Sequence, residues 1–482
     1  MKRFLSCGRK SVVLAVVMAL LCGCGGEAGG RVSDPESMTM GESSGSGGNV
    51  TDTESQEGSN STAPARERIT WGAHEAVYED GKEVLTFGMI SDWNGLGELI
   101  AAYNQQSDEY VVQMVNYYDE EKGYDASLTA LQLDIVKGEA PDILDLSSID
   151  YYPWAEKGIL EDLYTYIDKD GQLGRDDFMS NVLDAYSVEG KLYAIGTHFN
   201  LMTMCGKTSK VGEKTGYNVA ELLDMLERCG GDQNAIWGFG VEEPALTVLC
   251  TFSMNDFVDW DKGTCDFTGE AFRQILEFCK SYHAKALADG LRQAIRQDEV
   301  LLMMEMFNSV GDYQLAEGKF GEPITCVGFP VTEGSGTLAN MLGRYSINAA
   351  AANKDACWDF LKYMLQNDDS YGSLSLLRQR FDDAMQWAMT EETSEGPASV
   401  ERLPKASYIS LNESDSVYVY AASQEQVEAF RELVSSANRP YQYHSVIMNI
   451  IREEAEDYFN DQKSLEETVA VIQSRVSIYV AE

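Results

Sequence analysis

The stretch "DILDLSSIDYYPW", Asp142 to Trp154, begins as an apolar run typical of a buried strand. It then changes to serines, acids and three aromatic rings among four consecutive residues. Gly138 and Pro141 come just before it, and a glycine followed by a proline is a common end of a helix. The stretch therefore predicts a strand that directly follows a helix.

The preceding residues extend this alternation. Residues 84–90 and 110–116 are predicted strands because they are short, apolar and bounded by polar residues. Each precedes apolar residues at helical spacing, which are Leu96, Leu99, Ile100 and Tyr103 in the first helix and Leu128, Leu131 and Ile135 in the second. Strand, helix, strand, helix, strand in close succession predicts right-handed crossovers and a parallel sheet with helices on its faces.

The polar part of the stretch then marks a candidate binding edge. In open parallel sheets ligands bind beyond the carboxyl ends of the strands. Ser147, Ser148 and Asp150 lie at such an end and offer directional hydrogen bonds. In the aromatic run that follows, Tyr151, Tyr152 or Trp154 offers a flat apolar face, and Tyr152 is taken as the candidate contact. At least one ring of the run is expected to pack under the next helix, most readily Trp154, since large aromatic side chains are usually mostly buried.

Composition narrows the class of protein. The 482 residues carry 78 acidic and 37 basic side chains, a formal net charge of -41, and 44% are hydrophobic. This charge repels phosphate backbones and anionic lipid, so no nucleic-acid partner is expected. The segment from about residue 69 to 482 exceeds the size at which one hydrophobic core stops growing, so two lobes are expected.

The amino-terminal residues have the pattern of an export signal. Basic residues at positions 2, 3, 9 and 10 precede an apolar run, 12–21, that is too short to span a bilayer. The sequence Leu21-Cys22-Gly23-Cys24 resembles the lipobox of bacterial lipoproteins. We expect residues 1–23 to be the signal peptide and Cys24 to carry lipid on the outer face of the cell membrane. Residues 24–68, rich in Gly, Ser, Thr and Glu, are predicted to be a disordered linker with a reach of about 35 Å.

The ten cysteines do not form a framework in the sequence. Cys7 and Cys22 leave with the predicted signal and Cys24 is the lipid site, so seven remain, without a C-x-x-C pair. This argues against a zinc cluster and against a small fold held together by several disulfides. No metal or cofactor is expected, and a single disulfide among the seven stays an alternative. Those at positions 229, 279 and 357 lie in amphipathic helical patterns and are predicted to be small buried side chains.

Five segments, in order, resemble one known family. They are "VKGEAPDIL" (136–144), "EKGILEDL" (156–163), "GKLYAI" (190–195), "AANKDACWDFLKYML" (351–365) and "SLEETVAVIQSRVSIYVAE" (464–482). They are similar to the extracellular solute-binding proteins of ABC transporters, particularly the maltose-binding-like group for sugars. The likeness extends from about residue 84 to 482.

The resemblance implies a fold and a mechanism. It implies a two-lobed, type II periplasmic-binding-protein-like α/β fold, in which each lobe is a mainly parallel sheet flanked by helices and the lobes are joined by crossover segments. Lobe 1 would be 83–195 plus 331–366, and lobe 2 would be 196–330 plus 367–482. The lobes would close on a carbohydrate, expected to be an oligosaccharide, and deliver it to an ABC permease. A monomer tethered to the membrane by its lipid is expected.

The resemblance also places ligand contacts at strand ends and crossovers. These candidates are Asp92, Trp93, His198, Asn200, Trp237, Phe307, Asn308, Arg344 and Tyr345. Two alternatives stay open, because Trp93 can equally pack on the adjacent helix and His198 can equally be a hydrogen-bonded hinge residue. Four departures from the family pattern leave the sugar's identity open. Gly196 replaces a proline and is expected to loosen the hinge, and Met204-Cys205-Gly206-Lys207 stands where a tyrosine-asparagine-lysine is usual. Tyr217-Asn218 replaces the usual threonine-tryptophan opening of a helix, which Asn218 can still cap, and Ser309-Val310-Gly311 replaces a Gly-Pro-Trp.

Other functions find less support in the sequence. The four histidines are scattered, and the G-x-S-x-G match at 41–45 lies in the predicted linker. The segment 168–177 only partly matches a calcium loop and is predicted to be a solvated turn. A glycoside hydrolase needs two carboxylates at a defined separation. Since the chain has 78 acidic residues, the presence of two such residues in the sequence is not evidence for this activity. We expect no enzyme, while a sensor that reports its ligand to a membrane receptor stays an alternative to transport.

Overall fold

A computed structural model describes residues 75–90, 96–119, 121, 123–147, 149–240, 242–284, 290–369, 373–395, 400–409 and 416–481. The predicted signal peptide, the lipidation site Cys24 and the linker lie outside these residues. So do three candidate ligand contacts, Asp92, Trp93 and Ser148.

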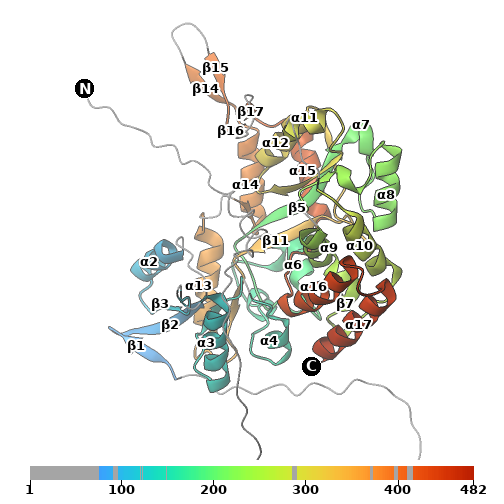
Figure 1. The fold of residues 1–482 in the computed structure, drawn as a ribbon. Helices are drawn as coiled ribbons and strands as arrows, with labels where there is room; N and C mark the ends of the chain where they lie inside the picture. The colour runs from blue at the N-terminus through green and yellow to red at the C-terminus, as the bar shows by residue number, and fades with distance from the viewer. Residues whose placement is uncertain are drawn as a thin grey trace, which may run out of the picture. The chain divides into compact units, whose positions relative to one another are not determined.

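The predicted strands before Trp154 form one five-stranded sheet (Figure 1). β2 (Lys82–Met89) pairs in parallel with β3 (Tyr110–Asn116) and with β4 (Ile143–Asp145), which confirms the predicted parallel arrangement. Two further strands pair antiparallel: β1 (Val77–Glu79) with the start of β2, and β12 (Tyr345–Ile347) with β4. The last of these brings a distant part of the chain back to the first sheet.

Helices of the predicted spacing cover this sheet. They are α2 (Leu96–Gln106), α3 (Tyr124–Lys137) and α13 (Lys354–Asn367). α3 ends as expected at Gly138, whose φ of 73° lies in the left-handed region that a residue with a Cβ adopts at a cost. The ring of Phe360 in α13 packs edge-on against Phe87 of β2 and Tyr103 of α2, at centroid distances of 6.1 and 4.9 Å.

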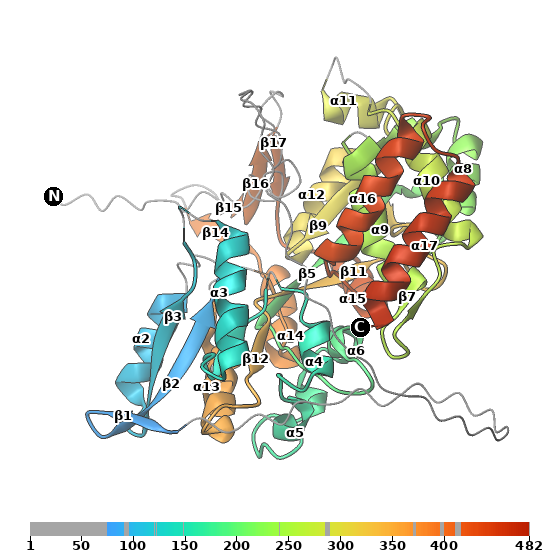
Figure 2. The same cartoon turned by 60° about the horizontal axis from the view of Figure 1, so that its bottom comes forward.

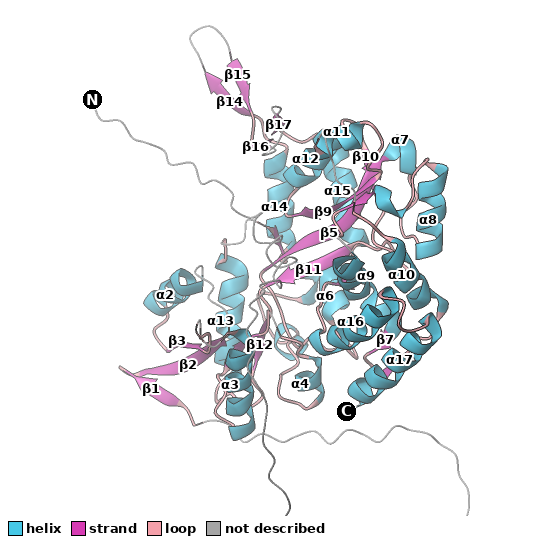
Figure 3. Cartoon of the chain, in the orientation of Figure 1, coloured by secondary structure: helices cyan, strands magenta, loops and turns pink. Residues whose placement is uncertain are grey.

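A seven-stranded sheet follows around one long buried strand, β5 (His198–Lys207). β5 pairs antiparallel with β9 (Leu302–Phe307), β10 (Ile324–Cys326), β11 (Leu338–Leu342) and β13 (Leu374–Ser375). β6 (Ile236–Trp237) runs parallel to β9, and β18 (Arg439–Pro440) runs parallel to β11. The expected mainly parallel pairing is therefore wrong for this sheet, because β5 runs against its neighbours and four of the six described strand pairings are antiparallel. β5 and β11 lie side by side in Figure 3.

Helices surround the second sheet. The longer ones are α8 (Val219–Arg228), α9 (Glu242–Phe257), α10 (Glu270–Ser281), α12 (Val310–Phe320), α14 (Arg378–Ala388), α15 (Gln424–Ser436), α16 (Ser445–Phe459) and α17 (Leu465–Ala481). Asn218 caps α8, since its side-chain oxygen accepts a hydrogen bond from the Glu221 N–H at 2.9 Å. α16 and α17 pack side by side near the carboxyl terminus (Figure 2).

The described chain also contains shorter elements, among them 3-10 turns at Arg175–Asp177 and Gln233–Ala235. The helices are α4 (Tyr152–Glu156), α5 (Tyr164–Ile167), α6 (Ser180–Tyr186), α7 (Thr208–Val211) and α11 (Leu291–Arg296). Three hairpins pair β7 (Val258–Asp259) with β8 (Thr264–Cys265), β14 (Glu392–Glu395) with β15 (Val400–Leu403), and β16 (Ala406–Ile409) with β17 (Ser416–Val419). No helix among the described residues has the length and apolar character needed to cross a membrane.

The turn at 168–177 is mostly exposed, as predicted, but the carboxylate of Asp170 accepts hydrogen bonds from Trp358 Nε1 at 2.9 Å and Lys362 Nζ at 3.1 Å, both on α13. One local prediction needs correction. Cys229 is only half-buried and lies just after α8, where its thiol donates to the Lys210 carbonyl, whereas Cys279 and Cys357 are buried as predicted.

Candidate functional site

Three crossings of the chain connect the two sheets, and they form the junction at which a site is expected. The chain leaves the first sheet at Ile195, enters β5, returns from β11 to β12, and crosses again between α13 and β13. Ile195 and Tyr345 exchange backbone N–H to carbonyl hydrogen bonds of 2.9 Å in both directions. The first two crossings therefore run as an antiparallel ribbon from one sheet to the other.

Gly196 is required at this ribbon for steric reasons. A Cβ at Gly196 would lie 2.4 Å from the Gly343 carbonyl oxygen and 2.5 Å from that of Leu342. Its replacement of the family's proline therefore permits close contact between the first two crossings, so it does not simply loosen the hinge.

A chain of amide side chains lies across the strands next to the ribbon. Asn340 Nδ2 on β11 donates to Asn200 Oδ1 on β5 at 3.2 Å, and Asn200 Nδ2 donates to Asn308 Oδ1, just after β9, at 3.4 Å. Ser373 Oγ, just before β13, donates to the same Asn308 oxygen at 3.1 Å. The structure thus brings together two predicted residues, Asn200 and Asn308, and adds Asn340 and Ser373. We call these four residues the amide chain.

Sequence reasoning missed Asn340 although a signal was present. It is the one polar residue in the strand "LANML", and its backbone register places it directly opposite Asn200. A carboxamide in an otherwise apolar strand needs a hydrogen-bond partner when it is buried. The partner strand could not be identified from the sequence, because Asn200 and Asn340 are 140 positions apart.

Arg344 and Ser147, both predicted, also come together at the junction. The Arg344 backbone N–H donates to Ser147 Oγ at 3.1 Å, and its guanidinium donates to the Ser147 carbonyl and to the Tyr441 carbonyl, the latter at 3.4 Å. Ser147 in turn donates to the carboxylate of Asp145 through its N–H, at 2.9 Å, and through its hydroxyl. Burial raises the pKa of Asp145, although these hydrogen bonds and the charge of Arg344 act in the opposite direction.

Several buried polar atoms in this part of the molecule have no hydrogen-bond partner among the described residues. They are Asp150 Oδ1, Tyr151 Oη, Arg344 Nε and both amide atoms of Gln442. Buried polar groups are normally hydrogen-bonded to protein, water or ligand. This concentration next to Ser147 and Tyr441 is consistent with a place that receives a polar molecule.

Asp150 and Tyr152 take part in a contact between distant segments. Asp150 Oδ2 lies 2.9 Å from His444 Nδ1 and accepts a hydrogen bond from Tyr479 Oη at 3.4 Å. The Tyr152 ring stacks on Trp260 at 5.2 Å between centroids, and Trp260 stacks on His444 at 4.3 Å. We call these five residues the aromatic clasp.

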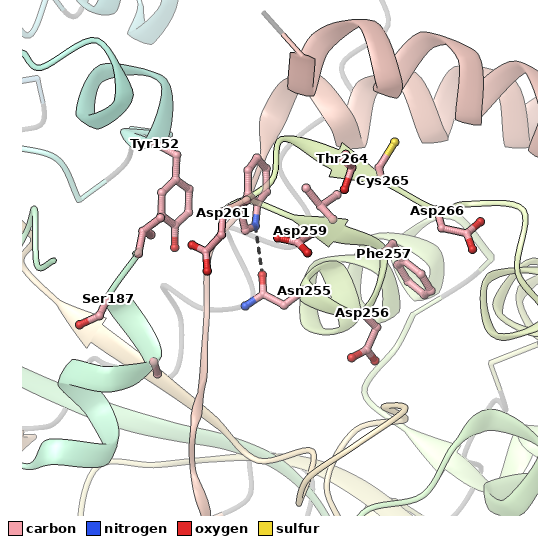
Figure 4. A pocket seen from close by; sticks show the side chains of 14 residues that line it. Tyr152, Ser187, Asn255, Asp256, Phe257, Asp259, Asp261, Thr264, Cys265 and Asp266 are labelled. Atoms are coloured by element: carbon pink, nitrogen blue, oxygen red, sulfur yellow. Dashed lines mark hydrogen bonds between the residues drawn. The ribbon is translucent and has the colours of Figure 1, made fainter. Parts of the chain in front are cut away.

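A pocket of about 520 Å³ adjoins the clasp (Figure 4). Tyr152 and residues 185, 187 and 188 line one side, and residues 255–261 and 264–266 line the other. Its carboxylates already have partners, since Asp256 pairs with Arg439 at 2.7 Å and Asp259 with Lys262 at 2.5 Å. Of the predicted ligand contacts only Tyr152 lines this pocket, and the amide chain does not.

The remaining predicted residues pack inside the protein. Phe307 is fully buried against Tyr313 and Phe430, and Tyr345 is buried against Phe87. Trp237 is half-buried in β6, with its Cα opposite Met303.

His198 is the first residue of β5, where the first crossing enters the second sheet. Its Nδ1 is 3.1 Å from Thr197 Oγ1 and 3.8 Å from Asp368, and burial lowers its pKa. Both alternatives stated for His198, a ligand contact and a hydrogen-bonded hinge residue, stay open. Trp154, which was expected to pack, is buried in α4.

Uncharged polar groups lie at the junction beside the guanidinium of Arg344. Burial raises the pKa of Tyr152 well above its usual value, so its phenol is neutral. Carboxamides, hydroxyls and aromatic faces together can hold hydroxyl groups and sugar ring faces. Among the described residues no group of three or more His, Cys, Asp or Glu is placed to hold a metal ion.

Comparisons with known proteins agree with this architecture. The model of the bacterial extracellular solute-binding protein family matches residues 98–374. The structure resembles the sugar-binding protein MalE from Xanthomonas citri with a TM-score of 0.52 and 15% identity, over 83% of this chain and 97% of that one. No curated protein matches the chain.

Two further solved structures are similar at lower scores. One is the substrate-binding protein Lmo0181 from Listeria monocytogenes, with a TM-score of 0.48 and 14% identity over 82% of this chain and 98% of that one. The other is a cyclic alpha-maltosyl-1,6-maltose binding protein from Arthrobacter globiformis, with a TM-score of 0.49 and 13% identity over 83% of this chain and 100% of that one. The family model covers more than half of the sequence, so the chain belongs to the bacterial extracellular solute-binding proteins.

Proposed function

We propose that this protein captures a carbohydrate, an oligosaccharide in particular, and delivers it unchanged to an ABC permease. The observation that carries the proposal is the amide chain of Asn340, Asn200, Asn308 and Ser373 at the junction of the two sheets. Each sugar hydroxyl is both a donor and an acceptor, and a carboxamide offers both functions without charge. The protein from Xanthomonas citri that shares the fold is described as sugar-binding.

The proposed ligand contacts come from both sides of the junction. Ser147, Asp150, Tyr152 and Arg344 would contribute from the ends of β4 and β12, and Asn200, Asn308, Asn340 and Ser373 from the second sheet. Asp92, Trp93 and Ser148 stay in the proposal on the family resemblance alone. Phe307 and Tyr345 are left out because their rings are enclosed by the core.

Closure of two lobes is the proposed mechanism. With the lobes at 83–195 plus 331–366 and 196–330 plus 367–482, a solute that contacts both would favour the closed state by its differential affinity. The three crossings are then the hinge, and the permease recognises the closed form.

The cellular setting of the proposal is the outer face of the cell membrane. The family is extracellular, and a lipid on Cys24 followed by the 24–68 linker would keep the binding body near the permease as a monomer. Labelling cells with a radioactive fatty acid tests the anchor, since Cys24→Ala should abolish incorporation.

Ligand panels test the substrate class directly. We expect oligosaccharides, but not amino acids or peptides, to raise the melting temperature of the purified protein. Asn308→Ala should weaken the binding of a sugar so identified by about 5- to 100-fold, because one to two hydrogen bonds are lost. Asn460→Ala, at an exposed position after α16, is the control. A rise in melting temperature with peptides alone would contradict the carbohydrate assignment, whereas equal losses of affinity in both variants would contradict the site.

A further inference from the structure

Two buried cysteines from distant parts of the sequence lie in contact in the second sheet. Cys205 on β5 and Cys326 on β10 have their Sγ atoms 3.0 Å apart, and 121 positions separate them in the chain. The two residues are 0% and 8% exposed. Two other described cysteines contact oxygen atoms instead: Cys229 donates to the Lys210 carbonyl at 3.1 Å, and Cys265 Sγ lies 3.4 Å from Ser477 Oγ.

The backbone register of this pair suits a covalent bond. Cys205 and Cys326 are directly opposite in an antiparallel pair. The flanking backbone hydrogen bonds, Val327 N–H to Met204 carbonyl at 2.8 Å and Thr208 N–H to Pro323 carbonyl at 3.0 Å, place the cysteines at a non-hydrogen-bonded position. Cα atoms at such positions are about 4.5 Å apart, which is within the range that disulfides span.

We propose that Cys205 and Cys326 form a disulfide in the exported protein, which links β5 to β10. The two thiols lose two protons and two electrons as the S–S bond forms. An external disulfide, of an exchange enzyme or a small molecule, takes up the electrons and is reduced to two thiols. Family membership places the chain outside the cell, where such bonds form and persist.

The bond would form before β10 docks fully. Burial raises the pKa of the Cys205 thiol, and the neighbouring Cys326 adds to this, so the folded protein holds little of the reactive thiolate. An exported chain meets an oxidant while both thiols are accessible. Once formed, the bond restricts the unfolded chain over a long loop, which stabilises the native state.

The position of the bond is compatible with lobe movement. Cys205 lies toward the end of β5 that is far from the hinge, whereas Gly196 and His198 lie at its hinge end. The bond therefore stiffens the second sheet without joining it to the first. It does not depend on the identity of the solute.

Peptide mapping tests this proposal on the full-length exported chain. The protein is denatured with iodoacetamide and no reductant, then digested with trypsin. We expect the peptide 192–207, which contains only Cys205, to be joined to the peptide 320–344, which contains only Cys326, and to separate on reduction. Recovery of both peptides as separate, fully alkylated species would overturn the proposal.

Variants and refolding give a second measurement. Dithiothreitol should lower the melting temperature of the wild type by about 5–10 °C and leave that of a Cys205→Ala, Cys326→Ala double variant unchanged. Cys250→Ala, at another buried cysteine, is the matched control and should keep the linked peptides. Refolding of the reduced wild type with oxidised glutathione should restore the link. If the link does not return, or if the double variant loses as much stability on reduction as the wild type, the assignment is wrong.

Discussion

At the crossings between the two sheets, two backbone segments lie so close together that one position has no room for a side chain. Gly196 faces the carbonyls of Leu342 and Gly343 and the side chain of Met341, all within 2.5 Å of a Cβ built at that position. The absence of a side chain lets the first two crossings pair, as the reciprocal bonds of Ile195 and Tyr345 show. The close pairing of the first two crossings therefore depends on the absence of a side chain at Gly196.

The first prediction concerns this position. Gly196→Ala should destabilise the protein by about 1–3 kcal/mol, because the methyl group overlaps backbone atoms that belong to a paired ribbon. Gly97→Ala in α2, where a Cβ meets no atom within 4 Å, should be neutral or stabilising by about 0.5–1 kcal/mol. Urea unfolding of the two variants measures both effects. Equal stability of Gly196→Ala and the wild type would show that the crossings are not as tightly paired as described.

At the scale of elements, one carboxylate holds α5 to α13. Burial alone would raise the pKa of Asp170, but hydrogen bonds from Trp358 Nε1, from the N–H groups of Gln172 and Leu173, and from Lys362 lower it to about 2. A carboxylate with a lowered pKa in the native state contributes stability above its unfolded pKa of about 3.9. That contribution is lost as the pH falls toward 2.

Asp170→Asn tests this linkage. At pH 7 the variant should lose about 1–2 kcal/mol of unfolding free energy, and the difference from the wild type should shrink as the pH falls from about 4 to 2. Denaturant unfolding across this pH range gives the comparison. Asp184→Asn, an exposed carboxylate on α6, should show no such trend. A difference between Asp170→Asn and the wild type that is constant with pH would mean that the carboxylate's charge is not what holds the helices.

At the scale of the whole molecule, the aromatic clasp connects segments assigned to different lobes. Asp150 and Tyr152 belong to the predicted first lobe, and Trp260, His444 and Tyr479 to the second. These contacts exist only while the segments stay together. They must therefore contribute to the balance between open and closed arrangements.

Trp260→Ala should shift this balance toward the open form. Loss of two ring contacts removes about 1–3 kcal/mol that favours the arrangement described here, so the radius of gyration of the ligand-free protein should increase. Small-angle scattering measures the change, and Trp387→Ala, an exposed ring on α14, is the control. Scattering profiles identical to that of the wild type would show that the clasp does not hold the lobes together.

The sequence by itself determined the local elements. The strands 84–90 and 110–116, the end of α3 at Gly138 and the cap of α8 at Asn218 each depend on neighbours within a few positions, which periodicity and cap chemistry report directly. The likeness of five segments to known proteins indicated the family, and the family in turn indicated the two-sheet fold. Of the candidate site, Asn200, Asn308, Ser147 and Arg344 could be proposed because polar residues at strand ends are visible in the sequence.

Only the tertiary structure decided the partners of those residues. The reversed direction of β5, the pairing of Asn200 with Asn340, the contact of Cys205 with Cys326 and the enclosure of Phe307 all join positions that lie far apart in the chain. Local patterns report which face of an element is apolar, but they do not report which distant segment packs against it. That choice follows from the complete packing of both sheets, because each buried side chain finds its neighbours only when the whole chain is folded.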